Sequence, residues 1–508
     1  MTLLCILLYA LGIPTLIYAI ICLWIELSLY LRSKWYAKQG MLHLHFPFKG
    51  WLKFLSDTGD PNNQLKLLYD SMKECKKQGY PALTVNNNIM GCSDVMLLDL
   101  ALIKEFFLKE NEVCIREANA DLKIDFGFIV EAGEKGLAHR RIFIEFFKIT
   151  NLDRMAPTIW EIVDSHFRSI KSKRPDGSLD IKSEQKFIEE LIIRIVNTLL
   201  FGDHAEIPRV SNGNSFSEET LGVLGAAFTK ETTFHPLNQL LFNYPHKYNL
   251  LAGSKEIVRR AKELKEAVIN HIKARESKAG SKDAQNSLNV IDMMIEWNRK
   301  SDEKDRLTYD EMVGDCYLFL VAGYDSTSTA VKSMIYNLGL RPDVRKTLKE
   351  DMEKTIGRPE GATVTFDTME KSNLLDRIVR ESIRANPPAG VLFPRRILKN
   401  FKIGKYQILK GDTISCPIGP LMWDTDYFPA GKTFDVNAIT EENKKWCMPF
   451  SVGVRNCIGQ NLAQLEIKII CMYILQRYEL ETTSQDMKYI FGFTTRVEGA
   501  HFKLTPLK

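Results

Sequence analysis

The segment Phe450–Gln460 reads FSVGVRNCIGQ and places Cys457 in a short glycine-rich loop near the end of a chain of 508 residues. The apolar-periodic sequence IGQNLAQLEIKII follows at once and predicts a helix, so that Cys457 lies at or near a helix N-terminus. Free N–H groups and the positive end of the helix dipole favour a thiolate there. Gly453 and Gly459 let a flat, bulky group approach the backbone closely, and Arg455 adds a positive charge. The loop is therefore a candidate metal-binding site.

The other cysteines do not suggest a zinc site or a disulfide framework. The chain has ten cysteines and no C-x-x-C pair, so most are expected to be reduced core residues. No second cysteine or histidine lies near Cys457 at zinc spacing, so a metal bound here would bring its other ligands with it, as haem iron does. The alternative is a buried structural cysteine.

The pattern Phe450-x-x-Gly453-x-Arg455-x-Cys457-x-Gly459 resembles the cysteine-ligand loop of the cytochrome P450 family, the haem-thiolate monooxygenases. This resemblance implies that Cys457 is the axial ligand of the iron of haem b and that the other four residues surround the bound group. It also implies a mainly α fold with small β-sheets (α+β), the cytochrome P450 fold.

A second motif, AGYDST at Ala322–Thr327, lies in the middle of the longest predicted helix, Thr308–Leu340. Thr308 and Glu311 predict a capping box at its start. Gly323 costs about 1 kcal/mol relative to alanine inside a helix. Taken alone, the motif fits an ordinary helix with one solvent-exposed face.

With the cysteine loop, this motif resembles the oxygen-activating segment of the family, where the helix opens locally beside the haem. The resemblance places Ala322 and Gly323 against the cofactor and gives Asp325 the acid position. Ser326 takes the position that is usually threonine, and Thr327 is a second candidate hydroxyl. Serine can hydrogen-bond as threonine does but lacks the methyl group that restricts the rotamer.

The motif ESIR supplies Glu381 and Arg384, an i,i+3 pair of a kind that is common on helix surfaces and worth about 0.2–0.5 kcal/mol there. Its place before the β segments and the cysteine loop resembles the structural pair that stabilises the haem-side core of the family. The family usually adds an arginine from a later segment. Here that segment reads DVNAI, and Ala438 occupies the arginine position.

The motif GLAHRR resembles the Trp-x-x-x-Arg helix of the family, with Gly136 in place of tryptophan and Arg140 in the basic position. The resemblance implies that His139 and Arg140 contact the haem propionates, together with Arg455 and with Arg395 of FPRRI. Charge-assisted pairing of arginine with a carboxylate is the physical reason. Taken singly, each arginine is an ordinary solvated charge.

The N-terminal run Thr2–Ile25 carries no charge. As a helix it would span ~36 Å, enough to cross a bilayer core of about 30 Å. Basic residues after it predict a cytoplasmic catalytic domain. A cleaved signal peptide and a buried core helix are the alternatives, but the run is long and no basic segment precedes it. We expect a transmembrane anchor at 1–31, a connector at 32–60 and a haem-thiolate monooxygenase domain at 61–508.

The remaining pattern predicts mostly helices with a few strands. Helices are expected at Ser183–Phe201, Ser254–Lys278, Asp367–Asn386 and Cys457–Tyr478, and a further helix opened by Pro342. Strands are expected at 80–87, 93–100, 391–397, 401–408 and 412–418, and a polar loop at Lys278–Ser287.

The resemblance implies an enzyme of the endoplasmic reticulum membrane, anchored by a single span, that inserts one oxygen atom from O2 into a lipophilic small molecule. No flavin or dinucleotide motif is present, so electrons would come from outside the chain. The resemblance implies an NADPH-dependent flavoprotein reductase as the donor, with cytochrome b5 as a further candidate. The stretch 134–141 with Lys444 and Lys445 would form a basic docking face. The net charge of +5 is small and does not argue for nucleic acid.

Three other functions remain open. A haem-thiolate isomerase or dehydratase works without a reductase, but such relatives tend to lose the acid–hydroxyl pair that this chain keeps at Asp325 and Ser326–Thr327. A non-catalytic haem sensor or carrier gains weight from the missing tryptophan and arginine, and a membrane-anchored structural protein would need no cofactor. The family places its variable pocket contacts in segments that do not identify a substrate: Cys114–Phe128, Leu221–Tyr244, Phe319–Ala322, Ala389–Phe393 and Phe491–Thr494.

Overall fold

The structure is a computed structural model of the whole chain. It describes residues 20, 23–44, 64–87, 92–116, 127–129, 133–170, 174–182, 186–202, 207–227, 254–278, 288–484, 487–491 and 494–507. Several predictions lie wholly or partly outside these residues: most of the anchor and the connector, the loop at 278–287, and the pocket residues 117–126, 228–244 and 492–493.

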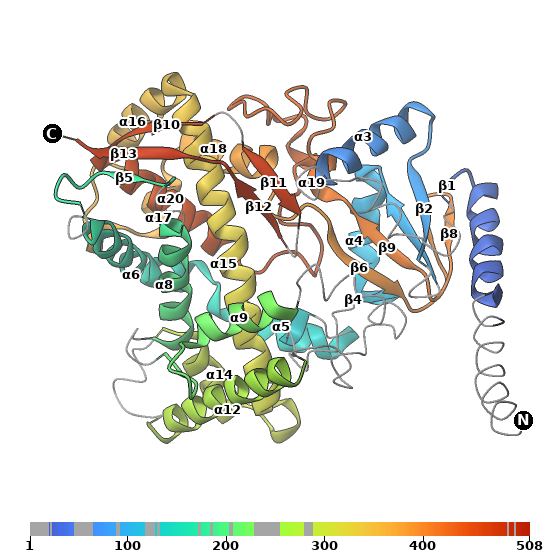
Figure 1. Cartoon of the computed structure of the whole chain (residues 1–508), viewed down its shortest axis with the longest axis horizontal. Coiled ribbons are helices and arrows are strands. Elements are labelled where there is room, and N and C mark those ends of the chain that lie inside the picture. Colours follow the sequence, from blue (N-terminus) through green and yellow to red (C-terminus); the bar gives the residue numbers. More distant parts are fainter. Residues whose placement is uncertain are drawn as a thin grey trace, which may run out of the picture. The chain divides into compact units, whose positions relative to one another are not determined.

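The chain divides into two compact units, Met1–Ile115 with Val391–Pro417, and Arg116–Gly390 with Ile418–Lys508. The first unit is built on a six-stranded sheet with the order β1-β2-β3-β9-β6-β4 (Figure 1). These strands are Leu42–Leu44, Ala82–Asn87, Cys92–Leu97, Thr413–Cys416, Leu392–Ile397 and Cys114–Arg116. The predicted strands β2 and β3 pair antiparallel, with Ala82 opposite Leu97, and every residue of β3 is buried.

Helices and a hairpin complete the first unit. They are α3 (Gln64–Lys77), α4 (Leu100–Val113), β7 (Phe401–Ile403) and β8 (Tyr406–Ile408). Residues 23–38 are also helical. Tyr36 Oη donates to Asp412 Oδ2 at 2.6 Å, and Arg32 pairs with the same carboxylate, so this helix is held to the start of β9. Within the part of the chain that the structure describes, no helix has both the length and the hydropathy needed to cross a bilayer.

The second unit is mainly helical. Its helices are α5 (Gly133–Phe146), α6 (Ile149–Arg168), α8 (Phe187–Phe201), α9 (Phe216–Ala227), α12 (Ser254–Lys278), α14 (Val290–Lys300), α15 (Tyr309–Leu340), α16 (Pro342–Thr355), α17 (Phe366–Glu370), α18 (Asn373–Ala385), α19 (Ile418–Leu421) and α20 (Gln460–Arg477). Two small sheets accompany them, β10-β13-β5 (Tyr478–Thr482, Phe502–Pro506, Leu179–Asp180) and β11-β12 (Lys488–Phe491, Thr495–Glu498).

The long helix α15 runs through this unit and packs against α8, α18 and α20 (Figure 1). The predicted capping box begins it: Thr308 Oγ1 accepts from the Glu311 N–H, and Glu311 Oε2 accepts from the Thr308 N–H at 2.8 Å. Gly323 lies where α8 crosses, and a Cβ atom there would be 3.2 Å from Val196 Cγ2. The glycine therefore allows the two helices to approach closely.

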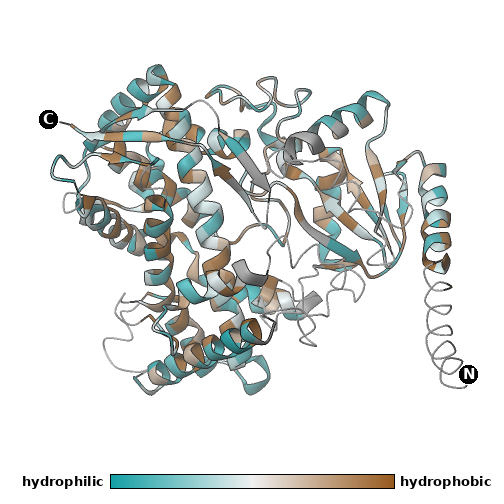
Figure 2. Ribbon diagram, viewed as in Figure 1, coloured by the Kyte–Doolittle hydropathy of each residue, from teal (hydrophilic) through white to brown (hydrophobic). Residues whose placement is uncertain are grey.

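The helix predicted at Asp367–Asn386 is wrong in one respect, because it is two helices, α17 and α18. Ser372 interrupts it: its hydroxyl accepts from the Leu375 N–H at 3.0 Å and caps a new helix. The amphipathic helix α12 matches its predicted bounds, and Figure 2 shows hydrophilic and hydrophobic residues alternating along it. The last predicted helix begins three residues late, at Gln460, and Tyr478 already belongs to strand β10.

Candidate active site

The cysteine loop is closed by backbone hydrogen bonds just before α20. Cys457 N donates to Phe450 O at 2.9 Å, and Asn456 N donates to Gly453 O at 3.2 Å. Gly453 has a φ of +82°, a conformation that side chains disfavour, so glycine is required at this turn. Gly459 caps α20, which places Cys457 beside the helix N-terminus as predicted.

The side chain of Cys457 is exposed, whereas the other described cysteines are buried or half-buried. Burial raises the pKa of the Cys92, Cys416 and Cys471 thiols to about 12, so these groups stay protonated at neutral pH. The described part of the chain holds no cluster of three or more His, Cys, Asp or Glu side chains that would bind a metal by themselves. That a metal at Cys457 would bring its other ligands with it stays a prediction.

Two buried arginines lie beside this loop. Arg140 of α5 donates through Nη2 to the backbone oxygen of Asn456 at 2.7 Å and to Asn456 Oδ1 at 2.8 Å. Arg455 donates through Nη1 to Phe128 O at 3.3 Å. The structure thus brings two of the predicted basic residues to the loop that carries the exposed thiol. Their positive charge favours a thiolate and suits an anionic ligand.

His139 Nε2 donates to Asp315 Oδ2 at 2.7 Å, and both side chains are buried. Asp315 belongs to none of the sequence motifs. A carboxylate inside the apolar run of the longest helix is the signal that would have found it, because buried charges are rarely unpaired. The contact of His139 with a haem propionate stays a prediction.

The motif Ala322–Thr327 is regular α-helix throughout, so the local opening implied by the resemblance is not present. The Ser326 hydroxyl donates to the Ala322 carbonyl at 2.7 Å, which satisfies this oxygen without unwinding the turn. Ala322 is exposed although the helix before it is mostly buried. Ala322 and Ser326 are four residues apart and therefore lie on the same side of α15. This side is the open face of α15.

The other residues of the motif lie elsewhere on the helix. Gly323 faces Val196 of α8, and Thr327, one turn later, shares that side and is buried. Asp325 is buried, and its carboxylate accepts a hydrogen bond from the hydroxyl of Thr494, which the sequence analysis placed only in a pocket segment. This hydrogen bond holds the Asp325 carboxylate against Thr494, the residue before β12.

An aromatic contact joins α15 to the cysteine loop. The Phe147 ring stacks on Phe319 of α15 with a centroid distance of 5.9 Å. The same ring would lie 3.8 Å from a Cβ atom at Gly459. Because Phe319 is one turn before Ala322, the two predicted motifs belong to one region of the second unit.

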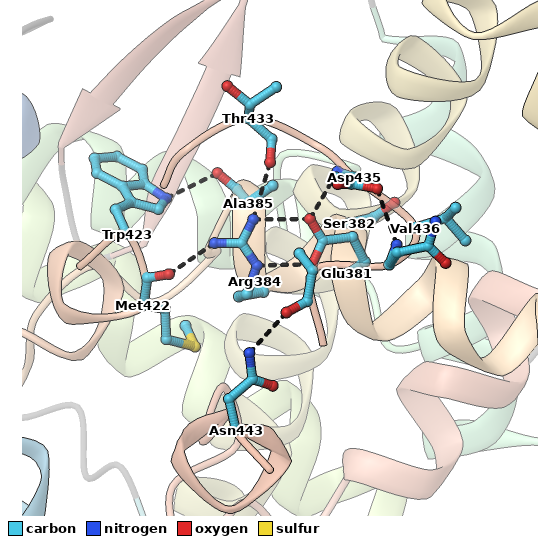
Figure 3. Close-up of polar contacts among 12 residues, drawn as sticks. Glu381, Ser382, Arg384, Ala385, Met422, Trp423, Thr433, Asp435, Val436 and Asn443 are labelled. Carbon is cyan, nitrogen blue, oxygen red and sulfur yellow. Dashed lines mark hydrogen bonds and ion pairs between the residues drawn. The ribbon is translucent and has the colours of Figure 1, made fainter. Parts of the chain in front are cut away.

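The pair Glu381–Arg384 is buried and bidentate, with Nε–Oε2 and Nη2–Oε1 distances of 2.7 Å (Figure 3). Arg384 also donates to three backbone carbonyls, those of Met422, Gly431 and Thr433. Glu381 Oε1 accepts the Asp435 N–H at 2.9 Å. Burial raises the pKa of Glu381, and these hydrogen bonds favour its charged form. The pair is structural and is not a surface ion pair.

Ala438, in the position of the missing arginine, is buried, and its carbonyl accepts from Asn443 Nδ2 at 2.8 Å. The charged link to this segment comes from α18 instead. Arg377 Nη2 donates to Val436 O at 3.0 Å and to Asn437 Oδ1 at 2.7 Å. The segment therefore keeps an arginine contact with α18 although its own arginine is absent.

Arg395 belongs to the first unit. Its Nε lies 3.0 Å from Glu110 Oε1, both side chains are buried, and the guanidinium lies over the Phe107 ring. This pairing gives Arg395 a structural role in the sheet, and its predicted contact with a propionate stays a prediction.

Comparison with known proteins gives a family match over most of the chain. The family model described as Cytochrome P450 matches residues 60–501. Cytochrome P450 3A25 of Mus musculus is 34% identical over 208 residues, 39% of this chain and 41% of that protein. Lithocholate 6-beta-hydroxylase of Mesocricetus auratus is 34% identical over 204 residues, 39% and 40% of the two chains. The chain thus matches about two fifths of the length of these relatives.

Among solved structures, the retinoic acid-bound cyanobacterial CYP120A1 has a similar fold. The TM-score is 0.68 at 20% sequence identity, and the match covers 86% of this chain and 94% of that one. This likeness supports the predicted fold class of helices with small sheets.

Proposed function

The chain belongs to the cytochrome P450 family, whose members bind haem b, and from this premise we propose that it is a haem-thiolate monooxygenase acting on a lipophilic small molecule. One oxygen atom of O2 would enter the substrate. The observation that carries the proposal is the exposed thiol of Cys457, beside a helix N-terminus and two buried arginines, in a chain whose other described thiols are largely buried.

The residues of this region fit haem. Cys457 would hold the iron, with Phe450, Gly453 and Gly459 shaping the loop around the thiolate, and Ala322 on the open face of α15 leaves room beside the helix. When bound, haem supplies the oxidising chemistry, and thiolate donation favours O–O cleavage. Arg140 and Arg455 would pair with its propionates.

Proton delivery is proposed for Asp325 and Ser326. Asp325 is held by the Thr494 hydroxyl, and Ser326 lies on the open face of α15, whereas Thr327 is buried on the side toward α8. The geometry therefore favours Ser326 over Thr327. Retention of the buried acid Asp325 and of the Ser326 hydroxyl on the open face supports a monooxygenase over an isomerase or dehydratase.

Electrons are proposed to come from an NADPH-dependent flavoprotein reductase, with cytochrome b5 as a further donor. Arg141 and Lys445 are exposed, as is Lys444, which pairs with Glu441. Salt would weaken the binding of an acidic partner to these groups. The rate of haem reduction should fall as ionic strength rises, and a salt-independent rate would rule out this docking face.

An anchor at 1–31, a connector at 32–60 and a catalytic domain at 61–508 are proposed, with a single span in the endoplasmic reticulum membrane. The helix at 23–38 supports this proposal, because it exposes large apolar and aromatic side chains: Leu23, Trp24, Leu27, Leu31 and Trp35. Trp and Tyr favour the bilayer interface. Carbonate washing of microsomes should leave the full chain in the pellet, and its release would contradict the anchor.

The reduced, carbon-monoxide-bound spectrum tests the haem site directly. The wild-type protein should show the band of a sulfur-ligated ferrous carbonyl, and Cys457→Ala should lose it. Cys447→Ala is the matched control, because this half-buried thiol has a pKa raised to about 12 by burial and should leave the band unchanged. If Cys457→Ala keeps the band, the ligand assignment is wrong.

Reductase-dependent NADPH consumption then separates the enzyme classes. A monooxygenase should consume NADPH and O2 with a lipophilic compound, whereas an isomerase, a dehydratase or a haem sensor should not need the reductase. Because one relative is named as a lithocholate hydroxylase, lithocholate is the first compound to test.

A further inference from the structure

We infer that His139 is a positioning residue that acts through Asp315 to hold both Arg140 and Arg455 at the cysteine loop. The inference rests on the proposed haem site. It gives His139 a role different from the direct propionate contact that the resemblance implies, and it brings in Asp315, an aspartate of α15 that lies two turns before the oxygen-activating motif.

The pair joins two helices at a buried point. His139 lies on α5 and Asp315 on α15, their side chains are 3% and 0% exposed, and the hydrogen bond between them is 2.7 Å long. The rings of Phe128 and Phe143 pack against the imidazole, with centroid distances of 5.8 and 6.0 Å. In such surroundings, removing one partner leaves the other polar group without its contact at high cost.

Asp315 also fixes the turn that holds Arg455. The Phe128 N–H donates to Asp315 Oδ1 at 3.2 Å, and the Phe128 carbonyl accepts from Arg455 Nη1 at 3.3 Å. Gly127 has a φ of +56°, and a Cβ atom there would lie 2.1 Å from Asp315 Oδ1. The backbone therefore approaches this carboxylate as only glycine permits, and the position of the turn depends on Asp315.

Arg140 is held by the same pair, because it follows His139 directly in α5. Its Nη2 binds the backbone and side-chain oxygens of Asn456, between Arg455 and Cys457. A second ion pair between α5 and α15, Lys135–Glu311 at 2.6 Å, has a lysine side chain that is 70% exposed and contributes little. The buried pair is thus the stronger of these two polar links between the helix of Arg140 and α15.

The test compares two buried histidines in the haem-loaded full chain. His139→Leu should speed transfer of haem to apomyoglobin about tenfold, the size typical of losing an outer-shell partner of a metal site. It should also shift the haem midpoint potential, because the arginines beside the loop lose their fixed positions. His139→Gln keeps a hydrogen-bond donor for Asp315. It should bring the haem-transfer rate and the midpoint potential partly back to the wild-type values. The double variant His139→Leu with Asp315→Leu removes the pair without leaving a buried charge unpaired. Because it also removes the acceptor of the Phe128 N–H, it should release haem at least as fast as His139→Leu.

His166→Leu is the matched control. His166 is also buried, packs against the Phe187 ring and donates to the Phe187 carbonyl at 2.9 Å, but it lies on α6, and this hydrogen bond joins α6 to the start of α8. It should lower the free energy of unfolding and leave haem transfer and potential unchanged.

The spectrum of the wild-type protein distinguishes failure of the His139 inference from failure of the proposed function. Suppose that the wild-type protein shows the sulfur-ligated ferrous carbonyl band, but that His139→Leu and the double variant release haem at the wild-type rate and keep the wild-type midpoint potential. The pair is then core packing only, and the inference is overturned. If the wild-type protein lacks that band, the proposed function fails and the inference fails with it.

Discussion

At the scale of single residues, Arg384 is fully buried, and its charge meets Glu381 on one side and backbone carbonyls on the other. Breaking a buried pair by removing one partner costs about 3–5 kcal/mol. Glu381→Gln should therefore lower the free energy of unfolding in urea by about this amount. Arg380→Ala is the control on the same helix, because its pair with Asp376 is partly exposed and should change stability by less than about 1 kcal/mol. Equal effects of the two variants would contradict a structural role for Glu381.

Ser326 and Thr327 are adjacent but differ in surroundings, and this gives a second prediction. Ser326→Ala removes the hydroxyl on the open face of α15 and should raise the hydrogen peroxide released per NADPH consumed, because protons are delivered less directly. Thr327→Val changes a buried side chain on the side toward α8 and should mainly lower the unfolding midpoint. Peroxide yield and thermal unfolding, measured on both variants, distinguish them. A higher peroxide yield for Thr327→Val alone would assign the role to Thr327.

Sequence reasoning found the residues whose motifs are local and missed those whose partners are distant. Cys457, Arg455 and Gly453 stand within five residues of one another, so their pattern is visible in the chain. Asp315 and its partner His139 are 176 positions apart, and Thr494 is 169 positions from Asp325. Only the fold brings these pairs together, which no spacing rule predicts.

At the scale of elements, α9 and α12 are joined by Glu219 and Arg260. The Arg260 guanidinium lowers the pKa of Glu219 to about 2, and the Glu219 side chain is only 1% exposed. A carboxylate whose folded pKa is depressed stabilises the fold above its unfolded pKa of about 4.5 and loses this contribution as pH falls toward 2.

Glu219→Gln should therefore flatten the pH dependence of stability between about pH 4.5 and 2, a contribution of at most about 3 kcal/mol. Urea unfolding at several pH values measures it. Glu266→Gln on α12 is the control, because its pair with Lys262 is exposed and 3.8 Å long. A pH profile of Glu219→Gln that is parallel to the wild-type profile would show that the pair does not control acid stability.

Helices were predicted correctly where the apolar periodicity extends over many residues or where the capping residues can be read from the sequence. The bounds of α12 and the capping box of α15 were both predictable from the sequence. The break between α17 and α18 was not, because an apolar pattern continues across it while the Ser372 side chain caps the second helix. Strand partners such as β3 with β9, which are more than 300 residues apart, also required the fold.

At the scale of the whole molecule, the helix at 23–38 packs into the first unit. Leu29 and Tyr36 are fully buried. The Asp412 carboxylate accepts hydrogen bonds from Tyr36 Oη, the Arg32 guanidinium and the Ser93 N–H. A chain that starts at residue 20 should keep the wild-type unfolding midpoint. A chain that starts at residue 39 should lose stability, because Asp412 is then buried without two of its partners. Differential scanning calorimetry of the two shortened chains decides this, and equal midpoints would contradict it.

The accessible thiol of Cys457 also has a practical consequence for handling the protein. Because the other described cysteines are buried or half-buried, a brief pulse of maleimide should label this sulfur well before them wherever it is not coordinated. The alkylated fraction, read by mass spectrometry of the peptide that contains Asn456, would count the molecules still lacking their prosthetic group. Newly synthesised chains are likewise open to oxidation at this atom until that group arrives, so supply of the cofactor during expression should limit the yield of usable protein.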